Sequence, residues 1–191
     1  MIPAYRFVAR SSDRENWLEA RKGGVTATEV AKAATPAGFV EAVDARMFPM
    51  EQPDNVYMQF GRESEPEIMR HAHSEHGILP NDWLIAAEHN PQHMATPDGL
   101  SVTHMEIAEV KTGGKPIKSV PRAHRDQVQW QLHTTGANQC LYLFNLRVPD
   151  DAGGFYLGYM EPQTFWIERD DERISFLIDT ANHLMEVTND F

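Results

Sequence analysis

The sequence predicts an α+β (mixed α/β) protein with a central β-sheet flanked by helices. Three observations support this class. Helical patterns fill the first 76 residues, short apolar runs bounded by turn residues follow Pro80, and two further helical patterns lie among and after those runs. The chain has 191 residues, of which 41% are hydrophobic, enough for one domain over 1–191 with a sizeable core.

The first half is predicted to be helical. Capping-box patterns begin helices at Ser12 and Thr26, and the glycine pair 23–24 separates them. Proline removes an interior hydrogen bond, so we expect Pro66 to bend or interrupt the last of these helices. A loop is expected around 49–53, between the third and fourth helices. The expected helices are 12–21, 26–34, 37–48 and 55–76.

The second half is predicted to form a sheet with two helices. Asp98 and Gly99 form a turn dipeptide between strands. Pro121 is favoured at a helix start, and Gly136 ends the helix that begins there. Ile174 and the apolar residues spaced behind it to 184 give the final helix its buried face. The expected strands are 83–88, a stretch around Met94, 105–111, 140–148, 155–161 and 165–168.

The charge is strongly acidic but unevenly distributed. A net charge of −11, with a pI near 5.2, taken alone argues against nucleic-acid binding, which needs local positive charge. Residues 111–125, however, hold five basic side chains and no acidic one. A solvated loop is the ordinary interpretation of such a run. Because this run directly follows the predicted strand 105–111, which carries Glu109 and Lys111, a DNA-binding segment is the better interpretation.

The number of cysteines and the lengths of the apolar runs indicate the cellular compartment. The single cysteine, Cys140, excludes an internal disulfide and any thiolate cluster. No apolar run is long enough to span a membrane, and the first residues lack the layout of a signal peptide. We therefore expect a cytoplasmic protein without a membrane partner.

Asp98, Glu109 and Lys111 carry the main chemical signal. Glu109 and Lys111 lie two apart on a predicted strand, so both side chains point to one face of the sheet. Asp98 begins the hairpin that leads to this strand, and its carboxylate can converge on Glu109. Two such carboxylates repel each other unless a divalent cation neutralises them, and oxygen ligands suit Mg²⁺ or Mn²⁺. Such a cation activates water for attack on a phosphate ester.

Taken alone, a Glu-x-Lys tripeptide is more often an ordinary exposed pair on a strand. Its specificity here comes from Asp98 upstream and from matching segments on both sides. Together they resemble the PD-(D/E)XK nuclease superfamily, and within it the lambda-exonuclease and YqaJ-type viral recombinase branch. The segments that carry the resemblance, in the order of that branch, are 17–29 (WLEARKGGVTATE), 60–66 (FGRESEP), 95–99 (ATPDG), 109–111 (EVK) and 127–132 (QVQWQL).

The resemblance implies a restriction-endonuclease-like core and a role for each matching residue. Asp98, Glu109, the Val110 carbonyl and Glu65 correspond to metal ligands. Lys111 corresponds to the residue that activates water. Gln127 corresponds to a glutamine that orients water or substrate phosphate. His124, Gln127 and Gln131 share one helical face, which would line the site; a solvated helix surface is the alternative.

The resemblance also implies a binding site for a terminal 5′-phosphate, formed by Arg21 and Thr28. The residues agree with this, because a glycine turn leads into a capped helix start and Arg21 is a bidentate phosphate donor. A structural glycine turn beside a surface arginine is the alternative. Basic residues after the catalytic strand would line the path of the DNA backbone without reading its sequence. They are Lys115, Lys118, Arg122 and Arg125.

The sequence thus predicts a Mg²⁺- or Mn²⁺-dependent exonuclease that digests one strand of a duplex end, 5′→3′, and leaves a 3′ overhang. The resemblance further implies a homotrimeric ring around DNA and a single-strand annealing protein as partner. Two alternatives stay open: an endonuclease of restriction or repair type, and a catalytically idle DNA-binding module. The phosphate-binding segment favours the exonuclease, and the intact acidic and lysine set argues against the idle module.

The remaining histidines and the cysteine are expected to be structural. The cluster of histidines and one glutamate at 71–76 is interpreted as a solvated helix face rather than a zinc site. His89, His93 and His104 are interpreted as scattered. Cys140 is interpreted as a small core residue, and one cysteine cannot hold the iron-sulfur cluster found in some nucleases of the superfamily.

Overall fold

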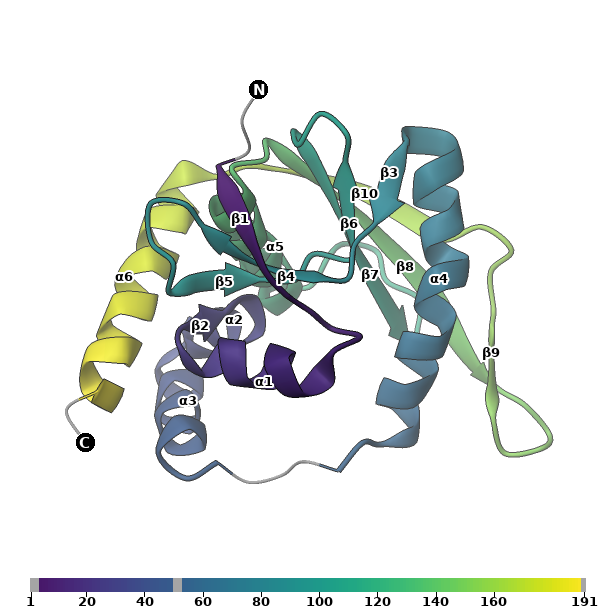
Figure 1. Ribbon diagram of the computed structural model, residues 1–191. Coiled ribbons are helices and arrows are strands. Elements are labelled where there is room, and N and C mark those ends of the chain that lie inside the picture. Colours follow the sequence, from purple (N-terminus) through teal and green to yellow (C-terminus); the bar gives the residue numbers. More distant parts are fainter. Residues whose placement is uncertain (1–3, 50–52, 190–191) are drawn as a thin grey trace.

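The computed structural model describes residues 4–49 and 53–189 and contains, in that part of the chain, six helices and ten strands (Figure 1). The helices are α1 (Arg14–Lys22), α2 (Ala27–Ala33), α3 (Pro36–Met47), α4 (Val56–His76), α5 (Arg122–Thr135) and α6 (Asp171–Asn189). The strands are β1 (Tyr5–Arg10), β2 (Val25–Thr26), β3 (Ile78–Pro80), β4 (Trp83–Ala87), β5 (His93–Ala95), β6 (Gly99–Ser101), β7 (Glu106–Gly113), β8 (Gln139–Pro149), β9 (Phe155–Leu157) and β10 (Gln163–Glu168).

The larger sheet is mixed, as predicted. Its strand order is β10-β8-β7-β6-β3, with β9 pairing to β8 at one end. β7 and β8 run parallel and are joined through α5, whereas the other neighbours are antiparallel. A second sheet has the order β1-β4-β5-β2. The α+β class is therefore confirmed, and the parallel pair β7 and β8 lies at the centre of the larger sheet.

The two faces of the larger sheet are covered by different helices. α4 packs on one face and α5 on the other (Figure 1). Alternation along β7 decides which residue meets which helix: Ala108 and Val110 join the α4 side, and Ile107 joins the α5 side. Glu109 and Lys111 lie two and four residues after Ile107 on the same strand, so their side chains point to the same face of the sheet, toward α5.

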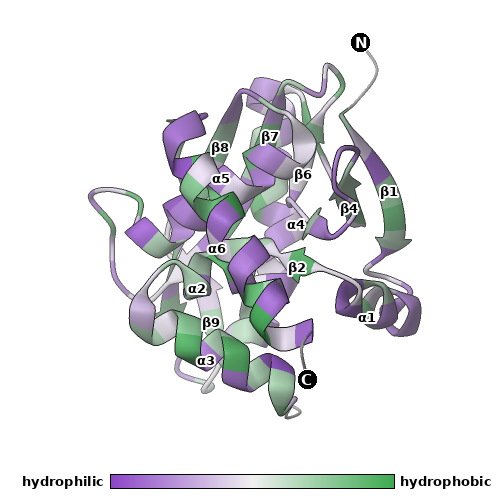
Figure 2. Cartoon of the chain, turned by 90° about the vertical axis from the view of Figure 1, so that its left-hand side faces the viewer, coloured by the Kyte–Doolittle hydropathy of each residue, from purple (hydrophilic) through white to green (hydrophobic). Residues whose placement is uncertain are grey.

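A third apolar cluster connects the second sheet to the remaining helices. α6 places its buried residues against α2, α3 and β4, and in Figure 2 hydrophobic and hydrophilic stretches alternate along α6, as expected for a helix that buries one side. Trp130 of α5 is fully buried in this cluster and donates from Nε1 to the Met94 carbonyl at 3.0 Å. α5 therefore contacts both sheets, which places it between the two parts of the fold.

Several predicted elements differ from the observed ones. β1, β2, β3 and β6 were not predicted, and β9 is shorter than the predicted 155–161. The first helix is capped by Asp13 rather than Ser12, because the Asp13 side chain accepts from the Asn16 N–H at 3.4 Å. α4 is one continuous helix through Pro66, so of the two expected effects of this proline the interruption does not occur.

Three short segments lie outside the described ranges. They are residues 1–3, residues 50–52 of the predicted loop, and residues 190–191. Within the described ranges, no helix is long and apolar enough to cross a membrane.

Candidate active site

The β6–β7 hairpin brings Asp98 to Glu109. Gly99 pairs with Ala108, so Asp98 follows as the next partner, opposite Glu109. The Asp98 N–H donates to the Ala108 carbonyl at 3.0 Å, and the Val110 N–H donates to Asp98 Oδ2 at 2.6 Å. The convergence expected from the turn dipeptide is therefore present in the structure.

Glu109 is held by three donors from two elements. Its side chain is almost fully buried, and Lys111 Nζ donates to Oε1 from the same face of β7. From α5, Gln127 Nε2 donates to Oε1 and Gln131 Nε2 to Oε2, both at 2.6 Å. The two glutamines lie four residues apart, so one turn of α5 presents both to the same carboxylate. This arrangement fixes the orientation of Glu109.

The glutamines are thus part of the site and not a solvated surface. Gln131 is fully buried, and its Oε1 is a buried acceptor with no hydrogen-bond partner in the described structure. A buried acceptor of this kind normally binds water or a ligand group. The third residue of the predicted face, His124, instead has its Nδ1 2.7 Å from the Tyr142 hydroxyl.

Glu65 on α4 adds a third carboxylate to this group. Burial, followed by the negative charge of Glu109, raises the pKa of Glu65 above its ordinary value. Burial and the charges of Glu109 and Glu65 raise the pKa of Asp98 well above its ordinary value. Burial disfavours the charge on Lys111, but the surrounding carboxylates outweigh it and raise the pKa of this ammonium. One ammonium therefore faces three carboxylates, which leaves an excess of negative charge.

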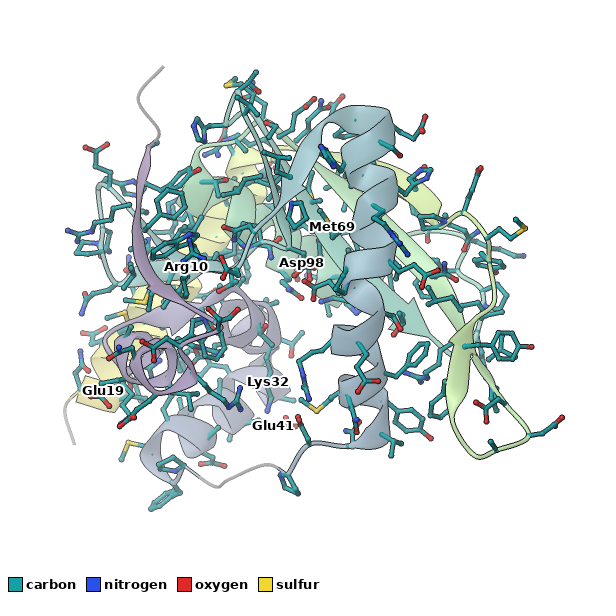
Figure 3. The ribbon with its side chains drawn as sticks, turned by 45° about the vertical axis from the view of Figure 1, so that its right-hand side comes forward. Arg10, Glu19, Lys32, Glu41, Met69 and Asp98 are labelled. Carbon is teal, nitrogen blue, oxygen red and sulfur yellow. The ribbon has the colours of Figure 1, made fainter. Side chains whose placement is uncertain are left out.

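One cavity of about 370 Å³ joins Glu65 and Asp98 to the N-terminal segment. Figure 3 shows Asp98 near the middle of the molecule, between the α1–α3 region and α4. From the acidic side the cavity is lined by Glu65, Asp98, Gln127 and Gln131. It is also lined by Arg14, Trp17, Arg21, Thr26 and Thr28 of the N-terminal segment, by Arg62 of α4 and by Thr96. Carboxylates and guanidinium groups thus share a single cavity.

Arg21 is positioned by two contacts. Its guanidinium lies over the Trp17 ring, 4.2 Å from the centroid, and one Nη is 3.4 Å from Thr26 Oγ1. Burial lowers the pKa of Arg21, the Glu29 carboxylate opposes this shift, and Arg14 adds to it. Thr28 is exposed at the start of α2 and lines the same cavity. Both residues predicted to bind a phosphate therefore reach the cavity that holds Asp98.

The turn before α2 depends on a glycine. A Cβ on Gly24 would lie 2.1 Å from the Gln92 carbonyl oxygen, so any side chain there would displace the backbone. Glu29 accepts from the Thr26 N–H at 2.9 Å, which confirms the predicted capping-box contact. Arg46 donates to both Glu29 and the Gly24 carbonyl. α2 has only seven residues, so binding of an anion here would depend on Arg21 and Thr28 rather than on the helix dipole.

The basic segment lies elsewhere. Lys118, Arg122 and Arg125 line a different cavity, of about 670 Å³, between α5, β10 and α6. Arg173 also lines it and binds Asp126 through two hydrogen bonds of 2.7 and 2.8 Å. Lys115 is exposed beyond β7. Of the predicted run, only Lys111 reaches the carboxylates. The basic residues that line the active-site cavity come from α1 and α4.

The predictions missed Arg14, Arg62 and Thr96 at the cavity. Arg62 lies within the 60–66 segment, and Thr96 lies two residues before Asp98, so their positions beside predicted site residues were the available signal. Arg14 carried no comparable signal. The interpretation of His89 and His93 as scattered is wrong, because both lie beside His133. Cys140 is fully buried, as predicted.

The fold and this site define a class: a nuclease of the PD-(D/E)XK superfamily with a restriction-endonuclease-like fold. The chain belongs to the family described as YqaJ-like viral recombinase domain, which matches residues 16–138. It is therefore a nuclease of the recombinase family.

Solved structures of exonucleases resemble most of this chain. The alkaline exonuclease LHK-Exo from Laribacter hongkongensis is 26% identical, with a TM-score of 0.68 over 92% of this chain and 93% of that one. A phage-related exonuclease from Haemophilus somnus 129PT is 15% identical, with a TM-score of 0.69 over 87% of this chain and 94% of that one, and shows a likeness of fold. The comparison with curated protein sequences finds no significant match.

Proposed function

We propose that this chain is a divalent-metal-dependent DNA exonuclease that digests one strand of a duplex end, 5′→3′, and leaves a 3′ overhang for recombination. The observation that carries the proposal is the shared cavity of about 370 Å³, in which the carboxylates Glu65 and Asp98 face Arg21 and Thr28. A cavity with both groups can hold a terminal phosphate at one end and a scissile phosphodiester at the other.

The donor set fits Mg²⁺ or Mn²⁺. Three carboxylates with a single ammonium leave negative charge that a cation would neutralise, and carboxylate and carbonyl oxygens are the ligands that these ions prefer. Glu65, Asp98, Glu109 and the Val110 carbonyl would hold the ion, and the three carboxylates, whose oxygens do not all lie within 4.8 Å of one another in the described structure, would draw together around it. When bound, it would stabilise the charge that develops on the phosphoryl oxygens.

The protein groups around the carboxylates have complementary tasks. Lys111, kept as an ammonium by the carboxylates, would orient the attacking water and stabilise the negative charge that develops on it. Gln127 and Gln131 keep the Glu109 carboxylate fixed, and the free Oε1 of Gln131 can accept from water or from a substrate hydroxyl. Preorganised groups of this kind lower the barrier because they need not reorient during the reaction.

Attack from an end, rather than within the duplex, is favoured by the arginines. Arg14 and Arg21 place two positive charges at the cavity, while Arg62 is paired with Asp54, and a terminal phosphate carries more negative charge than an internal phosphodiester. LHK-Exo has been crystallised with dAMP, a 5′-mononucleotide. A mononucleotide of this kind is the product expected from stepwise digestion. A trimeric ring around DNA and a single-strand annealing partner form part of the same proposal.

The reaction itself is tested with matched DNA substrates. We expect purified protein with Mg²⁺ to release mononucleotides from linear duplex and to leave closed circular duplex intact. In a chelator, neither substrate should be digested. Sequencing the protected strand determines polarity, and 3′ overhangs are expected. Cleavage of the circle would support the endonuclease alternative. Intact linear DNA with every divalent metal, from folded protein, would overturn the proposal.

The 5′-phosphate site gives a sharper prediction. We expect Arg21→Ala to lower kcat/KM on 5′-phosphorylated ends by roughly 10- to 100-fold, since a hydrogen bond to a charged group contributes about 1.5–3 kcal/mol. On 5′-hydroxyl ends the loss should be much smaller. The measurement is initial digestion rates on the two duplexes, with melting curves to show that Arg21→Ala folds.

Lys22→Ala is the matched control for this prediction. Lys22 is the next residue, is exposed, and pairs with Glu19 outside the cavity. It should leave both rates unchanged. Equal losses on both kinds of end for Arg21→Ala would contradict a terminal-phosphate role.

A further inference from the structure

Three histidines from two distant parts of the chain meet away from the carboxylates. His89 lies in the loop between β4 and β5, His93 begins β5, and His133 lies near the end of α5. One ring nitrogen from each lies within 4.8 Å of the others. In the described part of the chain, this is the one group of three or more histidine, cysteine or acidic side chains that meets this distance.

The contacts within the group are close. His93 Nδ1 is 2.9 Å from His133 Nε2. The ring centroids of His89 and His133 are 4.9 Å apart, and those of His93 and His133 are 5.1 Å apart. Asn90 Nδ2 donates to His93 Nε2 at 3.0 Å, and the Asn90 side-chain carbonyl oxygen accepts from the Gln92 N–H, so this asparagine holds the His93 ring in place. The rings therefore already converge from both elements.

The surroundings keep these imidazoles neutral. His93 and His133 are 2% and 6% exposed, and both rings pack against Trp130. Burial lowers the pKa of His93 to about 4 and, with His93 and His89 nearby, lowers the pKa of His133 to about 3. Neutral imidazole is the form that binds a metal. His89 is exposed, so a fourth position would be open to water.

We propose that His89, His93 and His133 form a second metal site, for Zn²⁺ or another transition ion that prefers imidazole. Three nitrogen ligands with an open position match a tetrahedral site, whereas Mg²⁺ prefers oxygen. In such a site the ligand nitrogens are about 3.3 Å apart, so His93 and His133 need to separate only slightly from 2.9 Å. The hydrogen bond between them is exchanged for two bonds to the metal.

The position of the site gives it a consequence for the fold. It would tie the β4–β5 loop to α5, and β5 leads directly to Thr96 and Asp98. α5 carries Gln127 and Gln131 on its other side. A bound ion would therefore stabilise the junction of two elements that carry active-site residues, and it would raise the unfolding temperature, because it binds the folded chain only.

The test uses metal-stripped full-length protein in excess Mg²⁺, which occupies oxygen sites. Co²⁺ is the probe, because tetrahedral nitrogen-bound Co²⁺ absorbs visible light far more strongly than octahedral oxygen-bound Co²⁺. We expect the absorption to saturate at one equivalent and to disappear when Zn²⁺ displaces Co²⁺. The unfolding midpoint should rise with Zn²⁺ concentration.

Variants assign the signal to this site. His89 is exposed, so His89→Ala should fold, lose the Co²⁺ absorption, and bind Zn²⁺ at least ~100-fold more weakly, beyond the 10–100-fold cost of outer-shell changes. His73→Ala, an exposed histidine on α4, and Asp98→Asn should both keep the absorption. No absorption in the wild type, its survival in His89→Ala, or its loss in Asp98→Asn would overturn the proposal.

Discussion

Replacing Lys111 by methionine is expected to reduce nuclease activity by about 10²- to 10³-fold, the range that follows from losing one preorganised group that stabilises charge in the transition state. Methionine keeps much of the length and apolar stem of lysine but removes the ammonium that contacts Glu109. The loss should appear in kcat more than in KM, since Lys111 acts on water rather than on the DNA backbone. Single-turnover digestion of a linear duplex measures it.

The same substitution should separate stability from catalysis. Glu109 is almost fully buried. In the metal-free variant its carboxylate would lose the contact with the Lys111 ammonium and keep only the two glutamine donors. The expected cost in free energy of unfolding is about 1–3 kcal/mol, less than the ~3–5 kcal/mol for breaking a fully buried pair, because the Lys111 side chain is 28% exposed. Mg²⁺ should restore this stability without restoring activity.

Lys32→Met serves as the control for Lys111→Met. Lys32 is an exposed residue of α2 that pairs with Glu41. It should change neither rate nor metal response. If Lys111→Met retained wild-type turnover, or if it lost activity only because Mg²⁺ no longer stabilised it, Lys111 would be a structural residue and not the group that acts on water.

The parts of the site that could be predicted are those fixed by local geometry. The two-residue period of β7 places Glu109 and Lys111 on one face. The hairpin register brings Asp98 to them, and the four-residue spacing on α5 aligns Gln127 with Gln131. Each of these relations follows from the regular geometry of one strand, hairpin or helix, so a pattern in the sequence was enough.

The parts that were missed depend on packing between distant elements. His93 and His133 are 40 residues apart, and only the packing of β5 against α5 makes them neighbours. The run at 111–125 shows the same limit. Its charge was evident, but α5 turns Arg122 and Arg125 toward β10 and α6, while Gln127 faces the active-site cavity. A helix has several faces, and charge density along the chain does not say which face a cavity adjoins.

Asp98→Asn is expected to lower activity by at least ~10³-fold, and at the same time to stabilise the metal-free protein at neutral pH. The activity falls because the metal set loses one of its charged ligands, a change equivalent to several kcal/mol of transition-state stabilisation. The fold should persist, because the amide oxygen of the substituted side chain can still accept from the Val110 N–H, as Asp98 Oδ2 does at 2.6 Å.

The stability gain has a definite pH dependence. Burial and the charges of Glu109 and Glu65 raise the pKa of Asp98 in the folded protein. A carboxyl group with a raised folded-state pKa stabilises the protein at a pH below its ordinary pKa, and this contribution is lost as the pH rises through the folded-state pKa. In a chelator, the advantage of Asp98→Asn should therefore be small at acidic pH and should grow toward neutrality.

Adding Mg²⁺ should reverse the order of the two proteins. The wild type gains stability because a cation neutralises its carboxylates, whereas Asp98→Asn has one charge fewer to offer and gains little. Thermal melts across pH, with and without Mg²⁺, measure both effects, and Asp151→Asn, at an exposed turn, is the matched control. A variant less stable than wild type in the chelator at neutral pH would show that Asp98 is held by favourable contacts. The excess of negative charge would then not be the property that prepares this site for a metal.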